Sequence, residues 1–399
     1  MQRGARRAGM GVAVAACAVL TACGSGNSSS GGSGGSSSKG DIKIAMTGPL
    51  TGDNGQYGQD QIQGMQLAVD QFNAAGGVPS GPNKGRKLSL SSHDDAGDPN
   101  QGASVAQQLC DDGGVLAVLG PVNSSVGLAV GPIYNRCGVT EVTSYASNPK
   151  ITLAGYQNVF RSIPNDNQLS AADVAAAVQV SGKKNLAVVY SNDDYGSGLY
   201  TGVQKALQQY GGTIVANQSF TPGSTKDFSS ILTKIKGANA DALLLMTTYS
   251  DAGLLANQAR QVGITSQLIV PTGSNTPQFL RLGGKAVEGV LTPVLFNPDS
   301  TDPAVQKFIT DFKAKFTRDP GESSATGYAS VQLVEYALTQ GATARKDVSE
   351  KLTAGKDMPT ILGTVTFDKN RDPSSLSSLV LLAVKDGKFV ASPTQFPAK

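Results

Sequence analysis

The chain has 399 residues, of which 33 are Lys or Arg and 30 are Asp or Glu, so its formal net charge is +3. Arg3, Arg6 and Arg7 carry that excess at the N-terminus, and the rest of the chain is close to neutral. Without a basic stripe or a charged tail, the composition excludes the usual nucleic-acid-binding classes. One histidine and four scattered cysteines argue against a zinc site, and we expect neither a metal nor a cofactor.

Residues 1–22 are typical of an export signal. A basic start precedes an apolar run at 10–20, which is too short to cross a bilayer comfortably. The run ends in Leu20-Thr21-Ala22-Cys23, which resembles the bacterial lipobox. That resemblance implies that Cys23 is lipidated, becomes the first residue of the mature protein and holds it on the outer face of the cytoplasmic membrane. The alternative is an ordinary cleaved signal with an incidental cysteine.

Residues 23–40 are almost entirely Gly and Ser after the cysteine. Such a segment behaves as a flexible coil with a reach of about 20–25 Å. We interpret it as a tether between the lipid anchor and a folded body that starts at residue 41. About 360 residues then remain, which is more than one hydrophobic core usually holds, and this predicts two lobes.

The remaining cysteines form a disulfide candidate. Cys17 leaves with the signal and Cys23 takes the lipid, so only Cys110 and Cys137 are left. An even pair in an oxidising compartment favours a disulfide. Two buried free thiols are the alternative.

From residue 41 the pattern alternates between strand-like and helix-like segments. The first series predicts strands at 41–46, 87–92, 115–119 and 139–143, and helices at 58–75, 99–109 and 124–134. The second predicts helices at 168–180, 195–210, 228–235 and 251–262, and strands at 185–190, 213–220, 242–246 and 268–270. Helices at 304–316 and 323–339 then precede a small antiparallel ending at 364–367 and 379–384. The series predict an α/β fold with two doubly wound parallel-sheet lobes.

Ligands of open α/β sheets bind beyond the carboxyl ends of the strands, where loops lead into helices. The apolar strand 115–119 leads into residues 120–125, which offer hydroxyls and free amides at the positive end of a helix. That end is a natural seat for a carboxylate, although an ordinary helix cap is the alternative. Tyr57, Tyr195 and Tyr249 also follow predicted strands, where a single tyrosine is more often a packing residue. We expect these loops to converge on one cleft.

With these segments in view, the chain resembles the branched-chain amino acid-binding proteins, which have the type I periplasmic-binding fold and serve ABC importers. The resemblance covers residues 41–384 and rests on segments 41–45, 51–58, 64–68, 73–77, 94–99, 120–125 and 195–198. It implies two lobes that close over one small molecule, with residues 41–163 and 294–345 in the first and 164–293 and 346–399 in the second. It also implies a hinge of chain crossings near 160–164, near 291–296 and near the C-terminal helices.

The resemblance assigns roles to residues of the cleft. Ser124 matches a serine that holds the ligand carboxylate, and Ser147 matches a threonine with a similar role. Tyr145 stands where the family has a small residue that offers its backbone. The set expected at the ligand, including the three pocket-wall tyrosines, is Tyr57, Val122, Asn123, Ser124, Tyr145, Ala146, Ser147, Tyr195, Tyr249 and Thr272.

One position departs from the family pattern. Thr272 stands where the family has the acidic partner of the ligand ammonium, and a hydroxyl cannot neutralise a buried ammonium. Either another acid substitutes, with Asp251 and Glu322 as candidates, or the ligand has no free amine. Ser323 falls on a family phenylalanine and would make the aliphatic side of the pocket more polar.

These features predict a lipid-anchored, monomeric substrate-binding protein. It would capture an amino acid of the branched-chain type, or a related small carboxylate, and deliver it to an ABC permease. The alternative is an extracellular sensor for amides, aromatic or keto acids that passes its state to a receptor partner. We expect no enzyme, because the sequence has no phosphate-binding loop and His93 is its only histidine. Asp94 and Asp95 could form a carboxylate pair, but we expect them to cap the turn before helix 99–109.

Overall fold

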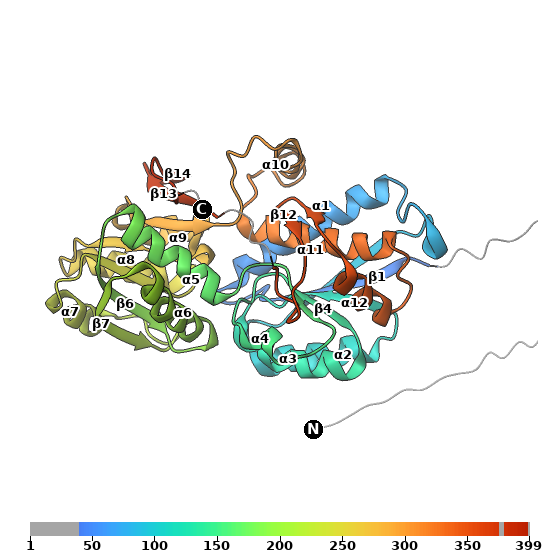
Figure 1. The fold of residues 1–399 in the computed structure, drawn as a ribbon, viewed down its shortest axis with the longest axis horizontal. Helices are drawn as coiled ribbons and strands as arrows, with labels where there is room; N and C mark the ends of the chain where they lie inside the picture. Colours follow the sequence, from blue (N-terminus) through green and yellow to red (C-terminus); the bar gives the residue numbers. More distant parts are fainter. Residues whose placement is uncertain (1–39, 375–378, 398–399) are drawn as a thin grey trace, which may run out of the picture. The chain divides into compact units, whose positions relative to one another are not determined.

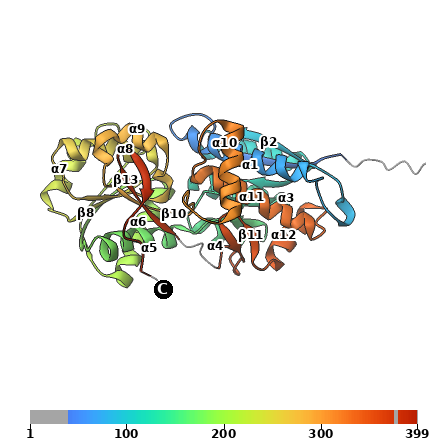
Figure 2. The same cartoon turned by 90° about the horizontal axis from the view of Figure 1, so that it is seen from above.

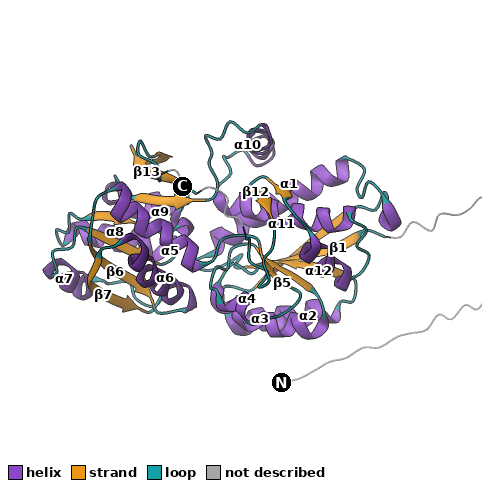
Figure 3. Cartoon of the chain, viewed as in Figure 1, coloured by secondary structure: helices purple, strands orange, loops and turns teal. Residues whose placement is uncertain are grey.

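The computed structural model describes residues 40–374 and 379–397, and the expected signal, Cys23 and the tether up to residue 39 lie outside this range. Residues 40–399 form one compact unit by their contacts. Within the described residues, the strands form sheets of five, seven and two strands. The two larger sheets belong to two lobes, with strands enclosed between helices in each (Figures 1 and 3).

The first sheet is parallel throughout, in the order β2-β1-β3-β4-β5. Its strands are β1 (Ile42–Gly48), β2 (Leu88–Asp94), β3 (Val115–Leu119), β4 (Thr140–Thr143) and β5 (Val159–Arg161). Every residue of the apolar run that forms β3 is buried. That is the pattern of a central parallel strand with helices on both faces.

Two helix layers enclose this sheet. One contains α1 (Gly55–Ala74), α11 (Glu322–Thr339) and α12 (Arg345–Ala354), which pack on a shared apolar cluster. The other contains α2 (Pro99–Asp111) and α3 (Ser124–Cys137). The short α4 (Lys150–Leu153) follows β4, and α10 (Pro303–Phe316) packs beside α1 and α11 (Figure 2). A 3-10 turn, η1 (Gly81–Asn83), precedes β2.

The second sheet has the order β14-β13-β10-β9-β8-β6-β7. Its parallel strands are β6 (Asn185–Ser191), β7 (Thr213–Phe220), β8 (Ala242–Met246), β9 (Gln267–Ile269) and β10 (Leu291–Val294). Two antiparallel strands, β13 (Val380–Lys385) and β14 (Lys388–Ala391), complete it. Side chains of β7 alternate in exposure, as befits a strand at the sheet edge.

Helices also cover both faces of the second sheet. On one face lie α5 (Asp166–Ala175), its π-helical continuation η2 (Ala176–Val180) and α6 (Asp194–Tyr210). On the other lie α7 (Ser229–Gly237), α8 (Tyr249–Gln261), α9 (Pro277–Gly283) and the 3-10 turn η4 (Gly284–Val287). Another 3-10 turn, η3 (Thr272–Ser274), follows β9. The predicted α/β fold with two sheets of parallel strands is therefore confirmed, and the antiparallel β13 and β14 extend one edge of the second sheet.

Two details of the predicted C-terminal part are wrong. Residues 364–367 and 379–384 do not form one antiparallel ending, because β12 (Gly363–Val365) pairs with β11 (Met358–Thr360) whereas β13 pairs with β10 and β14. The expected division also placed 346–374 in the second lobe. In the structure α12 and β11 pack against α11 and the apolar cluster of the first sheet, so this stretch belongs to the first lobe.

Candidate functional site

Loops at the carboxyl ends of the strands of both sheets surround one narrow cavity. The walls of this cavity enclose about 440 Å³, counting the space that opens to solvent. The lining residues are Tyr57, Val122, Asn123, Ser124, Tyr145, Ser147, Ile163, Leu169, Tyr195, Thr248, Thr272 and Gly273.

The start of α3 forms one wall of the cavity. Asn123 is the N-cap residue, and the amide of Gly127 donates to its carbonyl at 3.0 Å. The amides of the first turn have no partner within a helix, and the helix dipole makes this end positive. The hydroxyl of Ser124 lies in the same wall and accepts from the amide of Asn148 at 3.3 Å. This arrangement can hold a carboxylate.

Two buried hydroxyls of the loop after β4 also line the cavity. The hydroxyl of Tyr145 lies beside Ser323 and that of Ser147 beside Asp166. Neither makes a hydrogen bond of good geometry with residues 40–374 or 379–397. Burial raises the pKa of Tyr145 well above its usual value, so its phenol stays neutral and can donate. Buried hydroxyls in this state are groups that a polar ligand would satisfy.

Tyr57 ties the two lobes together at the cavity. Its hydroxyl donates to the carbonyl of Gly273 at 2.5 Å and accepts from the amide of Tyr249 at 3.2 Å. Its ring packs against Tyr145 and Tyr249, with centroids 5.2 Å and 4.7 Å away. Gly273 has little room beside Tyr195, because a Cβ on this glycine would lie 3.1 Å from the Tyr195 hydroxyl. The aromatic wall is therefore tightly packed around η3.

Behind Thr272 lies a buried carboxylate, Glu322, at the start of α11. The hydroxyl of Thr272 donates to one carboxylate oxygen of Glu322, and the amide of Leu295 donates to the other at 2.9 Å. Burial raises the pKa of Glu322 to about 7, and the bond from Thr272 opposes that shift. The contact joins η3 of the second lobe to a helix of the first.

Asp166, the first residue of α5, is a second buried acid close to the cavity, and the sequence did not single it out. Its amide donates to the carbonyl of Ser147 at 2.9 Å. Burial raises the pKa of its carboxyl group to about 7, while Ser147 and Arg161 act in the opposite direction. Gly198 of α6 lies against this carboxyl group, because a Cβ on Gly198 would be 2.1 Å from one carboxylate oxygen of Asp166. A residue with a side chain at position 198 would therefore collide with Asp166.

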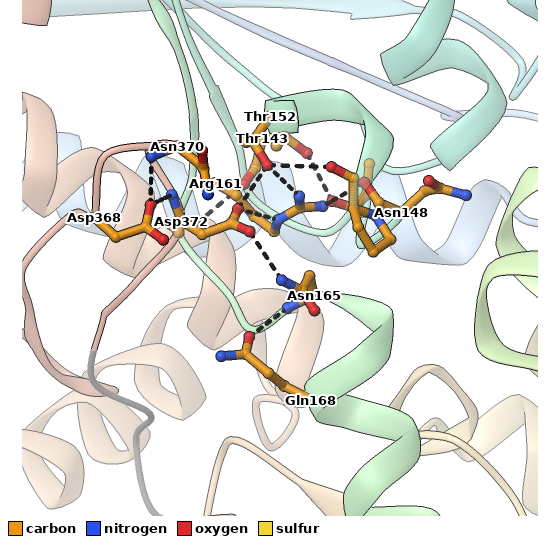
Figure 4. Close-up of polar contacts among 12 residues, drawn as sticks. Thr143, Asn148, Thr152, Arg161, Asn165, Gln168, Asp368, Asn370 and Asp372 are labelled. Carbon is orange, nitrogen blue, oxygen red and sulfur yellow. Dashed lines mark hydrogen bonds and ion pairs between the residues drawn. The ribbon is translucent and has the colours of Figure 1, made fainter. Parts of the chain in front are cut away.

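A buried ion pair holds the loop that carries Ser147 (Figure 4). Arg161, at the end of β5, is fully buried and its Nε lies 2.9 Å from a carboxylate oxygen of Asp372. One of its terminal nitrogens donates to the carbonyls of Ala146 and Asn148, at 3.1 Å and 2.9 Å. The guanidinium therefore fixes the backbone on both sides of Ser147.

Asp372 also contacts Asn165, in the segment where the chain passes from the first lobe to the second. Its second carboxylate oxygen accepts from the side chain of Asn165 at 2.9 Å, and Asn165 is the N-cap residue of α5 (Figure 4). Asp368 in turn accepts from the amides of Asn370 and Asp372, at 2.7 Å and 3.0 Å. The segment 368–372 thus links the hinge segment after β5 to the C-terminal part of the chain.

Eight of the ten residues expected at the ligand line this cavity; Ala146 and Tyr249 lie elsewhere. The Ala146 carbonyl faces Arg161, and the Tyr249 hydroxyl donates to the carbonyl of Asp53 at 2.8 Å in a separate polar cleft near the start of α1. The sequence analysis did not identify Ile163, Leu169, Thr248 or Gly273 as lining residues. Ile163 lies within the expected chain crossing at 160–164 and Leu169 follows that crossing by five residues, which was the available signal.

The candidate acids have different surroundings. Glu322 contacts Thr272, whereas Asp251 lies in the first turn of α8, and burial raises its pKa to about 6. Asp94 and Asp95 bond to the backbone of their own turn, including a 2.8 Å bond from the Ala96 amide to Asp94. The cap of α2 is Asp98 instead, which accepts from two amides of the first turn.

Cys110 and Cys137 form the expected disulfide, with their Cα atoms 5.7 Å apart. The bond joins the ends of α2 and α3, and so it braces the helix whose other end lines the cavity.

None of the helices in the described part of the chain is long and apolar enough to span a bilayer.

The chain matches the family model described as "Periplasmic binding protein" over residues 41–388. It is 32% identical to "Leu/Ile/Val-binding protein homolog 3" of Brucella melitensis over 354 residues, covering 88% of this chain and 93% of the relative. It is 30% identical to the Leu/Ile/Val-binding protein of Escherichia coli, covering 83% of this chain and 88% of the relative.

Solved structures show the same arrangement. One is the branched-chain amino acid transporter substrate-binding protein LivJ of Streptococcus pneumoniae in complex with isoleucine. Its TM-score is 0.81 at 26% identity, and the match covers 89% of this chain and 99% of that one. Another is a leucine-binding protein LivK of Thermotoga maritima, with a TM-score of 0.81, 27% identity and coverage of 89% and 99%.

Proposed function

Because the chain belongs to the periplasmic binding protein family, we propose that it captures a branched-chain amino acid, or a closely related small carboxylate, for an ABC importer. The observation that carries the proposal is a cavity between two lobes with the start of α3 in its wall. The names of the relatives and the isoleucine complex support this class of ligand. The family consists of substrate-binding transport proteins.

Two parts of the cavity suit two parts of such a ligand. The positive end of α3, with the hydroxyls of Ser124 and Ser147, suits the carboxylate. Val122, Ile163 and Leu169 offer an apolar surface to an aliphatic side chain. Closure of the lobes would exclude water and strengthen the polar contacts.

Removing the hydroxyl of Ser124 tests the carboxylate seat. We expect Ser124→Ala to weaken leucine binding by roughly 1–3 kcal/mol, because a buried carboxylate would lose one donor. Isothermal titration calorimetry with leucine, isoleucine and valine measures the change. Ser330→Ala is a matched control, since Ser330 is buried in α11, donates to the carbonyl of Gly327 at 2.7 Å and does not line the cavity. Equal affinities in the two variants would count against the seat.

We also propose that the protein is exported and lipid-anchored through Cys23, a residue outside the described range. The lipobox-like sequence and the Gly/Ser segment that follows it support this location. Cys23→Ser should move the protein from the membrane fraction to the soluble extracytoplasmic fraction, because the acceptor of the lipid is lost. Cys17→Ser keeps the acceptor and should leave the protein in the membrane fraction. Membrane retention of the Cys23 variant would refute the anchor.

A further inference from the structure

One wall of the cavity carries a phenol hydroxyl without a hydrogen-bond partner. Tyr145 follows β4 by two residues and lines the cavity, and its hydroxyl is buried. Within the part of the chain that the structure describes, this hydroxyl makes no hydrogen bond of good geometry. Burial raises its pKa well above the usual value, so the phenol keeps its hydrogen near neutral pH and can both donate and accept. A buried hydroxyl in this state costs free energy that a ligand could recover.

The neighbours of the Tyr145 hydroxyl do not satisfy it. Its ring packs against Tyr57, with the ring centroids 5.2 Å apart. The hydroxyl of Tyr57 already donates to the carbonyl of Gly273 at 2.5 Å and accepts from the amide of Tyr249 at 3.2 Å, so it has no hydrogen left for Tyr145. Ser323 lies beside the Tyr145 hydroxyl, but the contact lacks the geometry of a hydrogen bond. These neighbours leave the phenol available to a ligand.

Tyr145 faces a different part of the cavity from the proposed carboxylate seat. Ser147, two residues further along the chain, belongs to that seat and lies beside Asp166 of α5. Tyr145 packs instead against the apolar cluster that contains Val122 and Tyr57. Val122 is part of the surface that we assign to the side chain of the ligand. The phenol hydroxyl is therefore a polar group in the part of the cavity that receives this side chain.

We infer that Tyr145 is a specificity-determining residue, whose hydroxyl favours a ligand side chain that carries a hydrogen-bonding oxygen. Among small amino acids that branch at the β carbon, threonine has a hydroxyl where its isostere valine has a methyl group. The threonine hydroxyl can pair with the phenol, whereas the valine methyl group leaves the phenol buried and unpaired. The inference rests on the proposed function, because it assumes that an amino acid occupies the cavity. It adds a preference, within that ligand class, for a side chain that can make a hydrogen bond.

The test removes only the oxygen of the phenol. Isothermal titration calorimetry on the full-length protein compares threonine with valine in the wild type and in Tyr145→Phe. The substitution should lower the ratio of threonine affinity to valine affinity about 10-fold, because threonine loses a buried hydrogen bond and valine no longer leaves a phenol unpaired. The affinity for valine itself should not fall, since valine makes no hydrogen bond to the phenol.

Tyr134→Phe is the matched control, because it makes the same chemical change away from the cavity. Tyr134 of α3 is fully buried, and its hydroxyl has no partner of good geometry among residues 40–374 and 379–397, but it does not line the cavity. This variant should leave the ratio of threonine affinity to valine affinity unchanged. If Tyr145→Phe does not fold, Tyr145→Leu lacks the same hydroxyl and should show the same fall in the ratio.

The possible outcomes separate this inference from the proposed function. If the affinity ratio in the folded Tyr145 variant equals that of the wild type, the inference is overturned and the proposed function stands. An equal loss of affinity for both amino acids also overturns the inference, because the hydroxyl would then contact a group that the two ligands share or only hold the loop in place. Wild-type binding of leucine without measurable binding of threonine or valine would overturn it in the same way. If the wild-type protein binds no amino acid, the proposed function fails and the inference fails with it.

Discussion

Asp372→Ala should lower the free energy of unfolding by about 3–5 kcal/mol, the usual cost of leaving one member of a buried ion pair alone. Arg161 is fully buried and its partner carboxylate is nearly so. Without that carboxylate, the guanidinium keeps its charge in the protein interior, and Asn165 loses an acceptor as well. Chemical denaturation followed by circular dichroism measures the change.

The same substitution should also weaken ligand binding, because Arg161 holds the carbonyls on both sides of Ser147. Glu350→Ala is the control, since Glu350 forms an exposed pair with Lys346 at 3.3 Å. That variant should change the stability by less than about 0.5 kcal/mol. A comparably small effect for Asp372→Ala would show that the buried pair does not hold the hinge.

The ligand-free protein should be more stable near pH 5 than near pH 8, by on the order of 5 kcal/mol in free energy of unfolding. Burial raises the pKa of Asp166 and Glu322 to about 7 and that of Glu335 to about 8. In the unfolded chain the carboxyl groups of Asp and Glu have their ordinary pKa values of 3.8 and 4.5. Between these values and the raised pKa values of the folded protein, the folded state therefore binds more protons than the unfolded state. Stability therefore falls as the pH rises through this window.

Acids whose pKa is lowered in the folded protein change its stability in a different pH range, which lies below pH 5. The amide of Thr343 lowers the pKa of Asp347, so this group contributes stability above its unfolded pKa and loses it only in stronger acid. Denaturation curves at pH 5, 6, 7 and 8 measure the main effect, and Glu335→Gln should reduce the slope without touching the cavity. A stability that rises from pH 5 to pH 8 would contradict the raised pKa values of Asp166, Glu322 and Glu335 in the folded protein.

Local patterns in the sequence predicted much of the fold. The apolar run at 115–119 and the loop after it, 120–125, predicted both β3 and the position of Ser124 at the start of α3. The carboxyl ends of parallel strands meet at one edge, so residues after several strands could be predicted to share a cavity. Cys110 and Cys137 could be paired because they alone remained.

Contacts between distant segments could not be predicted in the same way. Arg161 and Asp372 are 211 residues apart, and neither lies in a pattern that reveals its partner. Tyr249 follows its strand as expected and its ring packs against Tyr57, yet its hydroxyl donates to the carbonyl of Asp53, which lies just before α1 in the chain. The packing of α12 against the first sheet also depends on tertiary contacts, since nothing in its own pattern identifies the lobe.

The most direct test of the account is a crystal structure of the protein with isoleucine. The account predicts one isoleucine between the lobes, with its carboxylate at the start of α3 within hydrogen-bond distance of Ser124 or Ser147, and its amine near Thr272. Isoleucine bound only in the polar cleft beside Asp53 and Tyr249, or no binding at saturating concentration, would contradict it.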